Sequence, residues 1–444
     1  MGGRKRRSHF KIERRGGRLT PSASRWSAPP PQGGRLFSVF SVGETLGSPL
    51  AGELSAQPTE GACGPDAPLP TPPCGATSPK GEARIFLKWL LLFLPPVALT
   101  ALFYAKENDR AFMDAWVENF LAPCIQAVGR FWSLFPFSVA EVMAALFIAV
   151  TVLGLFHTIY ILVKKRAWKT ALKRAVSFLC LLCWLWCGFC WLWNCTYRAT
   201  GFAEKYDLST APYSPEQLLD VTILFAYQAA ELSKQVPRNE DLSFALPTGE
   251  AFARGVSVYD NMGKYFPSLD IPQRRAKPIF CSRLQSMLGY TGIYFPFTGE
   301  ANVNVDQVNA CIPFTIAHEM AHQRMVAAEQ ECNFVGVLAC ISSEDVVFQY
   351  SGWLMGLVYL TNAIFDFSPE LGEEIMRQIF TDELRKDWND NYEYWKALES
   401  PTQEKASQAM DQVYDGYLKS QGQALGLMSY NACVDLLVNY FYIP

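Results

Sequence analysis

Three long apolar runs constrain the fold of this 444-residue chain more than any other feature. They span about 85–105, 139–163 and 175–195, and each approaches the roughly 20 residues that a helix needs to cross a bilayer. Hydrophobic residues make up 50% of the chain, which is high for a soluble enzyme. We therefore predict three transmembrane helices in a membrane region at 84–197, with bilayer lipid around them.

Charged residues between the runs predict the orientation of the chain. The segment between the second and third runs contains cations and no acid: Lys164, Lys165, Arg166, Lys169, Lys173 and Arg174. Loops enriched in Lys and Arg stay in the cytoplasm. We therefore expect a multi-pass protein of the cell membrane, with residues 1–83 inside the cell and the body at 198–444 outside it.

The two segments that flank the membrane region differ in kind. Residues 1–83 are basic, rich in Pro and Gly, and lack a sustained hydrophobic period, so we predict a disordered tail. At 214–216 and 368–370 the body has Ser-Pro-Glu, which puts a capping Ser, a Pro and an acid where a helix starts. The body is therefore predicted to be mostly helical.

A fourth apolar stretch, at 346–365, is also long enough to cross a membrane. Its flanks are Glu344, Asp345 and Asp366, with no cation among them. Helices buried in a globular core can be apolar on every side. We therefore expect a buried helix of the body here, with a fourth span as the alternative.

Two of the four His in the chain stand four residues apart, as His318-Glu319-Met320-Ala321-His322. A helix brings residues four apart onto one face, so both imidazoles can bind one Zn²⁺ while Glu319 reaches a water on the metal. Catalytic zinc takes three protein ligands and leaves one position open. The pattern predicts one catalytic zinc per chain with Glu319 as general base. The alternative is a pair of core His that bind nothing.

The third zinc ligand has to be a carboxylate or a thiolate, because the body holds no further His. Glu329 stands just downstream, and Asn333 shares its helix face four residues on, where it can orient a ligand His. Glu331 points about 200° round the helix from Glu329, so only one of the two can bind the metal. We predict Glu329 and keep Glu331 as the alternative. The link from His322 to Glu329 then has to reverse sharply without a Gly.

Around these residues the sequence resembles gluzincin-type metallopeptidases, in which a Glu followed four residues later by Asp or Asn completes the His-Glu-x-x-His site. Over residues 85–444 it resembles more closely a bacterial membrane family, domain of unknown function 3810. The shared residues are 294–302 (YFPFTGEAN), the His motif with Gln323 after it, and 350–352 (YSG). In that family a Gly commonly stands at the position of Met325.

This resemblance implies a fold and further site residues. The fold would be a mainly α membrane protein, with three N-terminal transmembrane helices followed by a mostly helical, zincin-like extracellular domain with a small edge strand. By similarity to gluzincins, an extended peptide would lie on an edge strand made of Gly299, Glu300, Ala301 and Asn302. A plain structural strand is the alternative. The second donor to the oxyanion would be Tyr350 or Tyr430.

We therefore predict a membrane-anchored zinc metalloprotease that hydrolyses peptide bonds of cell-surface or membrane-proximal proteins. Its partners would be a protein or peptide substrate and membrane lipid, and no nucleic acid is expected. The alternative is a non-catalytic membrane protein whose extracellular module binds a partner, with or without zinc to organise it. The sequence leaves the oligomeric state open.

Overall fold

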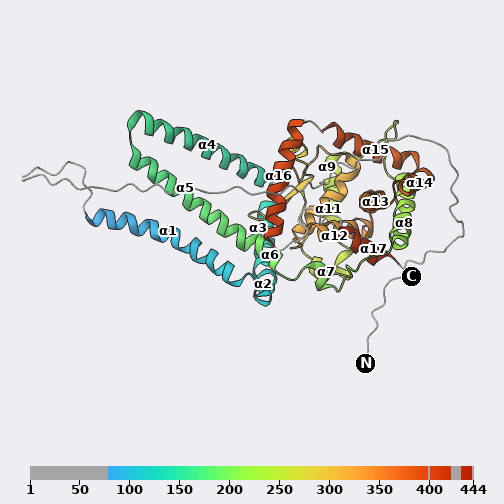
Figure 1. The fold of residues 1–444 in the computed structure, drawn as a ribbon, viewed down its shortest axis with the longest axis horizontal. Coiled ribbons are helices and arrows are strands. Elements are labelled where there is room, and N and C mark those ends of the chain that lie inside the picture. Colours follow the sequence, from blue (N-terminus) through green and yellow to red (C-terminus); the bar gives the residue numbers. More distant parts are fainter. Residues whose placement is uncertain (1–78, 399–400, 422–431, 443–444) are drawn as a thin grey trace, which may run out of the picture.

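The computed structural model of the chain describes residues 79–398, 401–421 and 432–442. This part is mostly helical with one small sheet, which confirms the helical class predicted from the sequence (Figure 1). Residues 1–78 of the predicted tail lie outside the described part, and 79–83 already belong to the first helix.

The helices fall into an N-terminal set and a body set. The N-terminal set is α1 (Pro79–Lys106), α2 (Arg110–Trp116), α3 (Ala122–Trp132), α4 (Val139–Lys165), α5 (Trp168–Phe189) and α6 (Cys195–Arg198), with the π-helical turns η1 (Val117–Leu121) and η2 (Cys190–Asn194). The body set is α7 (Phe202–Lys205), α8 (Pro215–Ser233), α9 (Thr248–Arg254), α10 (Ser282–Met287), α11 (Ile312–His322), α12 (Glu329–Ser342), α13 (Val346–Phe367), α14 (Pro369–Ile379), α15 (Asp382–Ala397), α16 (Pro401–Ser420) and α17 (Ala432–Phe441). Short 3-10 turns lie at Gly255–Ser257, Met262–Lys264, Pro267–Leu269 and Asn309–Cys311.

Two helical stretches, Val139–Lys165 and Trp168–Arg198, are long and apolar enough to cross a membrane. They form a hairpin that projects from the globular body (Figure 1). Helix α1 packs along α5 on the same side of the body, but its apolar part, Leu91–Lys106, is shorter. Two helices able to span a membrane are therefore present among the described residues, and the third predicted span is not established.

Helix α13 runs through the body in contact with α8, α11 and α12. Its buried side chains include Tyr350, Leu357 and Ile364. They belong to the main hydrophobic core, whose buried residues come from Phe202 to Val438. The prediction of a buried helix at 346–365 is therefore confirmed.

The sheet has the strand order β1-β3-β2 and lies against α11. Strand β1 (Lys277–Pro278) pairs parallel with β3 (Glu300–Val303), and β2 (Gly292–Phe295) pairs antiparallel with it. Gly299, with a φ of +66°, lies in the turn between β2 and β3. Because β3 is the central strand, the prediction that 299–302 forms an edge strand is wrong. The two-residue β1 gives no signal in the sequence, so the pairing on that side could not be foreseen.

Glu300 ties this sheet to the first turn of α4. Its carboxylate accepts hydrogen bonds from the backbone N–H of Val139 (3.3 Å) and of Ala140 (2.8 Å), and it forms a buried ion pair with Lys277. A carboxylate at a helix N-terminus is favoured because it satisfies free N–H groups and faces the positive end of the helix dipole. The body is thus fixed to the start of the helical hairpin.

Candidate metal centre

Helix α11 carries His318, Glu319 and His322 in its C-terminal half. Its N-terminal end is bound to α13 in the core. The N–H of Phe314 donates to the hydroxyl of Ser351 (3.0 Å), and that hydroxyl donates to the carbonyl of Ala310 (2.6 Å). Ser351 thereby satisfies one of the free N–H groups at the start of the helix. These two hydrogen bonds give a structural role to the Ser of the Tyr-Ser-Gly sequence at 350–352.

His318, His322 and Glu329 form a buried group whose ligand atoms all lie within 4.8 Å of one another. Nε2 of His318 is 3.2 Å from Oε2 of Glu329, and Nε2 of His322 is 3.7 Å from Oε1. The imidazole centroids of the two His are 5.1 Å apart. Two imidazoles and one carboxylate are a donor set that catalytic zinc sites use. The group could therefore hold one metal ion.

The chain reverses between His322 and Glu329 through a helix end of the Schellman type. The N–H of Met325 donates to the carbonyl of His322 (3.0 Å), and that of Val326 donates to the carbonyl of Ala321 (3.3 Å). Met325 has a φ of +63°, the left-handed conformation that Gly usually supplies at this position. A link without Gly can therefore make the sharp turn, at the expense of backbone strain at Met325.

Hydrogen bonding orients His322. Its Nδ1 lies 2.8 Å from the carbonyl oxygen of Val326, which can only accept, so Nδ1 carries a proton and the neutral ring would offer Nε2, on the side of Glu329, to a metal. A metal-binding His usually has such a contact at its far nitrogen. Sγ of Cys332 lies 3.2 Å from the same Nδ1. Burial alone would lower the pKa of His322, but Cys332 and Glu329 raise it well above its usual value.

Glu331 lies apart from this group. Its carboxylate accepts hydrogen bonds from the backbone N–H of Phe202 and of Ala203, both at 2.9 Å, at the start of α7. Burial raises the pKa of Glu331, although these two bonds lower it. The structure therefore brings Glu329, and not Glu331, to the two His.

Glu319 is buried beside the two His, and its Oε2 has no hydrogen-bond partner in the described part of the chain. Gly292 of β2 leaves room for it, because a Cβ added there would lie 2.3 Å from Oε1 of Glu319. Burial raises the pKa of Glu319 to about 7, although His318 and His322 lower it. A carboxylate with a free oxygen and a pKa near neutrality has the properties of a general base.

Asn333 is buried on α12, but no hydrogen bond joins it to either His among the described residues. Its Oδ1 accepts from the hydroxyl of Tyr359 (3.1 Å), and its Nδ2 has no partner there. Nδ1 of His318 is likewise without a partner in the described part. The carbonyl of Val326 is the group that orients His322, and sequence reasoning missed it because backbone carbonyls leave no trace in side-chain patterns.

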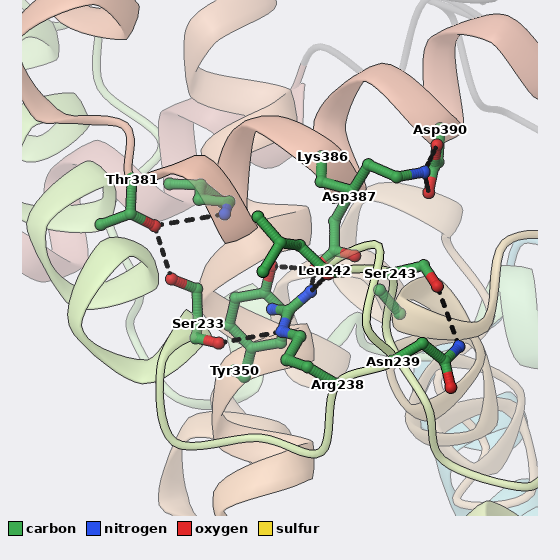
Figure 2. Close-up of polar contacts among 12 residues, drawn as sticks. Ser233, Arg238, Asn239, Leu242, Ser243, Tyr350, Thr381, Lys386, Asp387 and Asp390 are labelled. Atoms are coloured by element: carbon green, nitrogen blue, oxygen red, sulfur yellow. Dashed lines mark hydrogen bonds and ion pairs between the residues drawn. The ribbon is translucent and has the colours of Figure 1, made fainter.

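Of the two tyrosines predicted as oxyanion donors, Tyr350 lies away from the centre. The hydroxyl of Tyr350 bonds to Asp387 in a separate buried cluster, where Arg238 also bonds to Asp387 at 2.7 Å (Figure 2). Arg238 further bonds to the carbonyl of Leu242, so this cluster fixes the loop after α8 to α13 and α15. Tyr430 lies outside the described residues.

A different tyrosine, Tyr414 of α16, reaches the centre. Its hydroxyl donates to Oε1 of Glu329 at 2.6 Å, across a sequence separation of 85 residues. On the same helix, Tyr417 donates to Asn194 of η2, the turn that follows α5 (2.9 Å). Helix α16 therefore lies between the hairpin and the rest of the body (Figure 1). No local pattern could have indicated Tyr414, because only the tertiary fold brings α16 to α12.

Aromatic side chains form one wall of the centre. The ring of Trp193, in the turn η2 that follows α5, has its centroid 5.4 Å from that of His322 and 5.0 Å from that of Tyr294. Tyr294 in turn lies 6.2 Å from His322. The candidate metal centre is therefore next to the end of a helix that can span a membrane.

Comparison with known proteins gives one match. A family model described as "Protein of unknown function (DUF3810)" matches residues 116–438. No curated protein and no solved structure matches the chain. The matched range covers most of the chain and includes α4, α5, the sheet and the helices α11, α12 and α16 that form the centre. The chain therefore belongs to the DUF3810 family.

Proposed function

We propose that this protein is a membrane-anchored zinc metallopeptidase that hydrolyses peptide bonds of cell-surface or membrane-proximal proteins. The observation that carries the proposal is the buried group of His318, His322 and Glu329 with Glu319 beside it. A pair of core His that bind nothing would not need both Nε2 atoms close to one carboxylate while a backbone carbonyl holds the far nitrogen of His322. The arrangement supports one gluzincin-like zinc per chain.

A Zn²⁺ held by these three side chains would lower the pKa of a water to about 7 and polarise the carbonyl of the substrate. Glu319 takes a proton from the attacking water while the oxygen of that water bonds to the carbonyl carbon of the substrate. Glu319 then gives this proton to the leaving amine as the C–N bond breaks. The buried free oxygen of Glu319 supports this role.

Tyr414 is the residue we propose as the second donor to the oxyanion. Its hydroxyl already lies at hydrogen-bond distance from Glu329, so a small rotation would turn it toward a carbonyl bound at the centre. The residues first predicted for this role were Tyr350 and Tyr430. Tyr350 is engaged with Asp387 elsewhere.

The substrate would pair with β2, the edge strand that borders Glu319. The N–H of Asn304 donates to the carbonyl of Thr291 at 2.9 Å. Because pairing alternates along antiparallel strands, Gly292 and Tyr294 direct their N–H and C=O groups to the outer edge. An extended peptide can add to such an edge through main-chain hydrogen bonds. Gly292 lies against Glu319, so a peptide on this edge would pass the candidate base.

We further propose that α1 supplies a third span and that the body is extracellular. The stretch Leu91–Lys106 exposes most of its large apolar side chains and packs beside α5. The basic segment 164–174 lies at the tip of the hairpin, at the end away from the body (Figure 1). Because basic loops stay in the cytoplasm, this arrangement supports a body on the outer side. A centre beside α5 would then favour substrates close to the membrane.

Zinc content and hydrolysis, measured together on full-length protein in lipid nanodiscs, test the proposal. We expect wild type and Glu319→Gln to hold one zinc each, whereas the variant cleaves a membrane-tethered peptide library at least about a hundredfold more slowly. Glu331→Gln is the matched control, because it also turns a buried carboxylate into an amide but lies outside the centre. Zinc without cleavage in wild type would favour the non-catalytic binding module, and absence of zinc would remove the metal site.

A further inference from the structure

A group of exposed apolar side chains, which we call the apolar collar, lies near the N-terminal end of α4. Its members are exposed side chains: Phe131, Leu134, Phe135, Phe137, Phe280, Leu284 and Met287. The first four precede α4 in the chain, and the other three come from the body, at and just before α10. We propose that this collar lies within the bilayer leaflet next to the body and binds lipid acyl chains.

Two hydrogen bonds hold the body part of the collar at the level of the first turn of α4. Glu141, in that turn, accepts from the backbone N–H of Phe280 (2.8 Å) and of Cys281 (2.7 Å). The N–H of Glu141 itself donates to the capping Ser138 (3.0 Å). Because the side-chain carboxylate of Glu141 accepts from two consecutive backbone N–H groups, Phe280 cannot move away from α4 without breaking these bonds.

The side chains of the collar are far more exposed than apolar groups in contact with a protein core. Phe280 is 94% exposed, so its ring has almost no contact with the described part of the chain. The rings of Phe131, Phe135 and Phe137 form a row, with centroids 6.3 and 5.8 Å apart. Contiguous apolar patches on protein surfaces mark binding sites, and aromatic residues gather where a membrane meets water.

The bilayer is the occupant that the structure favours. The collar continues into the exposed apolar surface of α4, which begins with Val142, Met143 and Leu146. Whatever surrounds this 27-residue helix therefore also reaches the collar. A helix of this length and hydropathy is surrounded by acyl chains when it spans a bilayer. The inference rests on the spanning role proposed for α4, and it adds that the body itself is held against the lipid.

Photo-crosslinking to lipid tests the collar. A benzophenone amino acid is incorporated singly at position 280 or 284 of the full-length protein in phosphatidylcholine nanodiscs, and lipid adducts are quantified by mass spectrometry. Position 148 in the middle of α4 is the positive control, and exposed Tyr227 on α8, at the end of the body away from the hairpin, is the negative control. We expect adducts at 280 and 284 at least about fivefold above those at 227.

The outcomes separate the collar from the span. If position 148 gives adducts while positions 280 and 284 give no more than position 227, the collar proposal is overturned and α4 remains in the membrane. Absence of adducts at all positions would overturn both. Crosslinks from 280 to a second copy of the protein in place of lipid would also overturn the proposal, because the collar would then be a protein interface.

Discussion

Helices α4 and α13 are both long and apolar, yet they occupy opposite environments. Helix α4 leaves large side chains such as Ile148, Val150 and Leu153 exposed, whereas α13 buries Phe348, Leu357 and Ile364 in the core of the body. The difference lies in the small residues. A Cβ added to Gly154 of α4 would meet nothing within 4 Å, but one added to Gly356 of α13 would lie 2.3 Å from the ring of Phe225. Apolar content thus does not separate an exposed apolar helix from a core helix, and close contacts at Gly do.

The largest expected effect comes from filling these two glycines. Gly356→Ala forces a methyl into the ring of Phe225, so we expect the free energy of unfolding to fall by about 3 kcal/mol. Gly154→Ala has open space around it and should not lower stability. Thermal unfolding of full-length protein in nanodiscs measures both. Equal effects in the two variants would mean that α4 is packed as tightly as α13.

A smaller difference is expected for hydroxyls on the same two helices. Ser351 of α13 connects Phe314 and Ala310, so Ser351→Ala leaves a buried N–H unpaired and should cost about 2 kcal/mol. Thr158 of α4 bonds only to the carbonyl of Gly154 within its own helix, so Thr158→Ala should change stability by less than about 0.5 kcal/mol. The same thermal unfolding measurement distinguishes them. A large loss for Thr158→Ala alone would reverse the comparison.

The smallest effect, relief of left-handed backbone strain, should be of the same size at the end of α4 and after α11. Arg166 ends α4 with a φ of +46°, and Met325 follows α11 with a φ of +63°. Left-handed strain is a property of the local backbone, so Met325→Gly and Arg166→Gly should each raise stability by about 1 kcal/mol. Ala327→Gly is the control for Met325→Gly and should lower stability, because Gly gains freedom in the unfolded chain without relieving strain. A loss of stability in Met325→Gly would show that the Met side chain contributes more than the strain costs.

The sequence predicts those parts of the molecule that depend on local periodicity. The apolar runs at α4 and α5, the buried helix at 346–365 and the helix that carries His318 and His322 all follow from spacing along one element. The different directions of Glu329 and Glu331 could be predicted for the same reason, because residues two apart on one helix point to different sides of it.

Features that depend on contacts between distant segments could not be predicted. The two-residue β1 makes β3 a central strand, and Tyr414 reaches Glu329 from 85 residues away. Met325 is an intermediate case. The need for a reversal was visible in the sequence, and the Gly that the resembled family commonly has at this position pointed to it, but a non-Gly residue in the left-handed conformation is too uncommon to be expected there.

The identity of the third ligand is the central claim, and zinc content tests it most directly. Zinc per chain is measured by mass spectrometry on full-length wild type, Glu329→Gln and Glu331→Gln after equal exposure to the metal. Because Glu329 lies 3.2 Å from His318 whereas Glu331 bonds to α7, we predict that wild type and Glu331→Gln keep one zinc each and Glu329→Gln loses it. Loss of zinc from Glu331→Gln alone, or a full zinc complement in Glu329→Gln, would contradict this account.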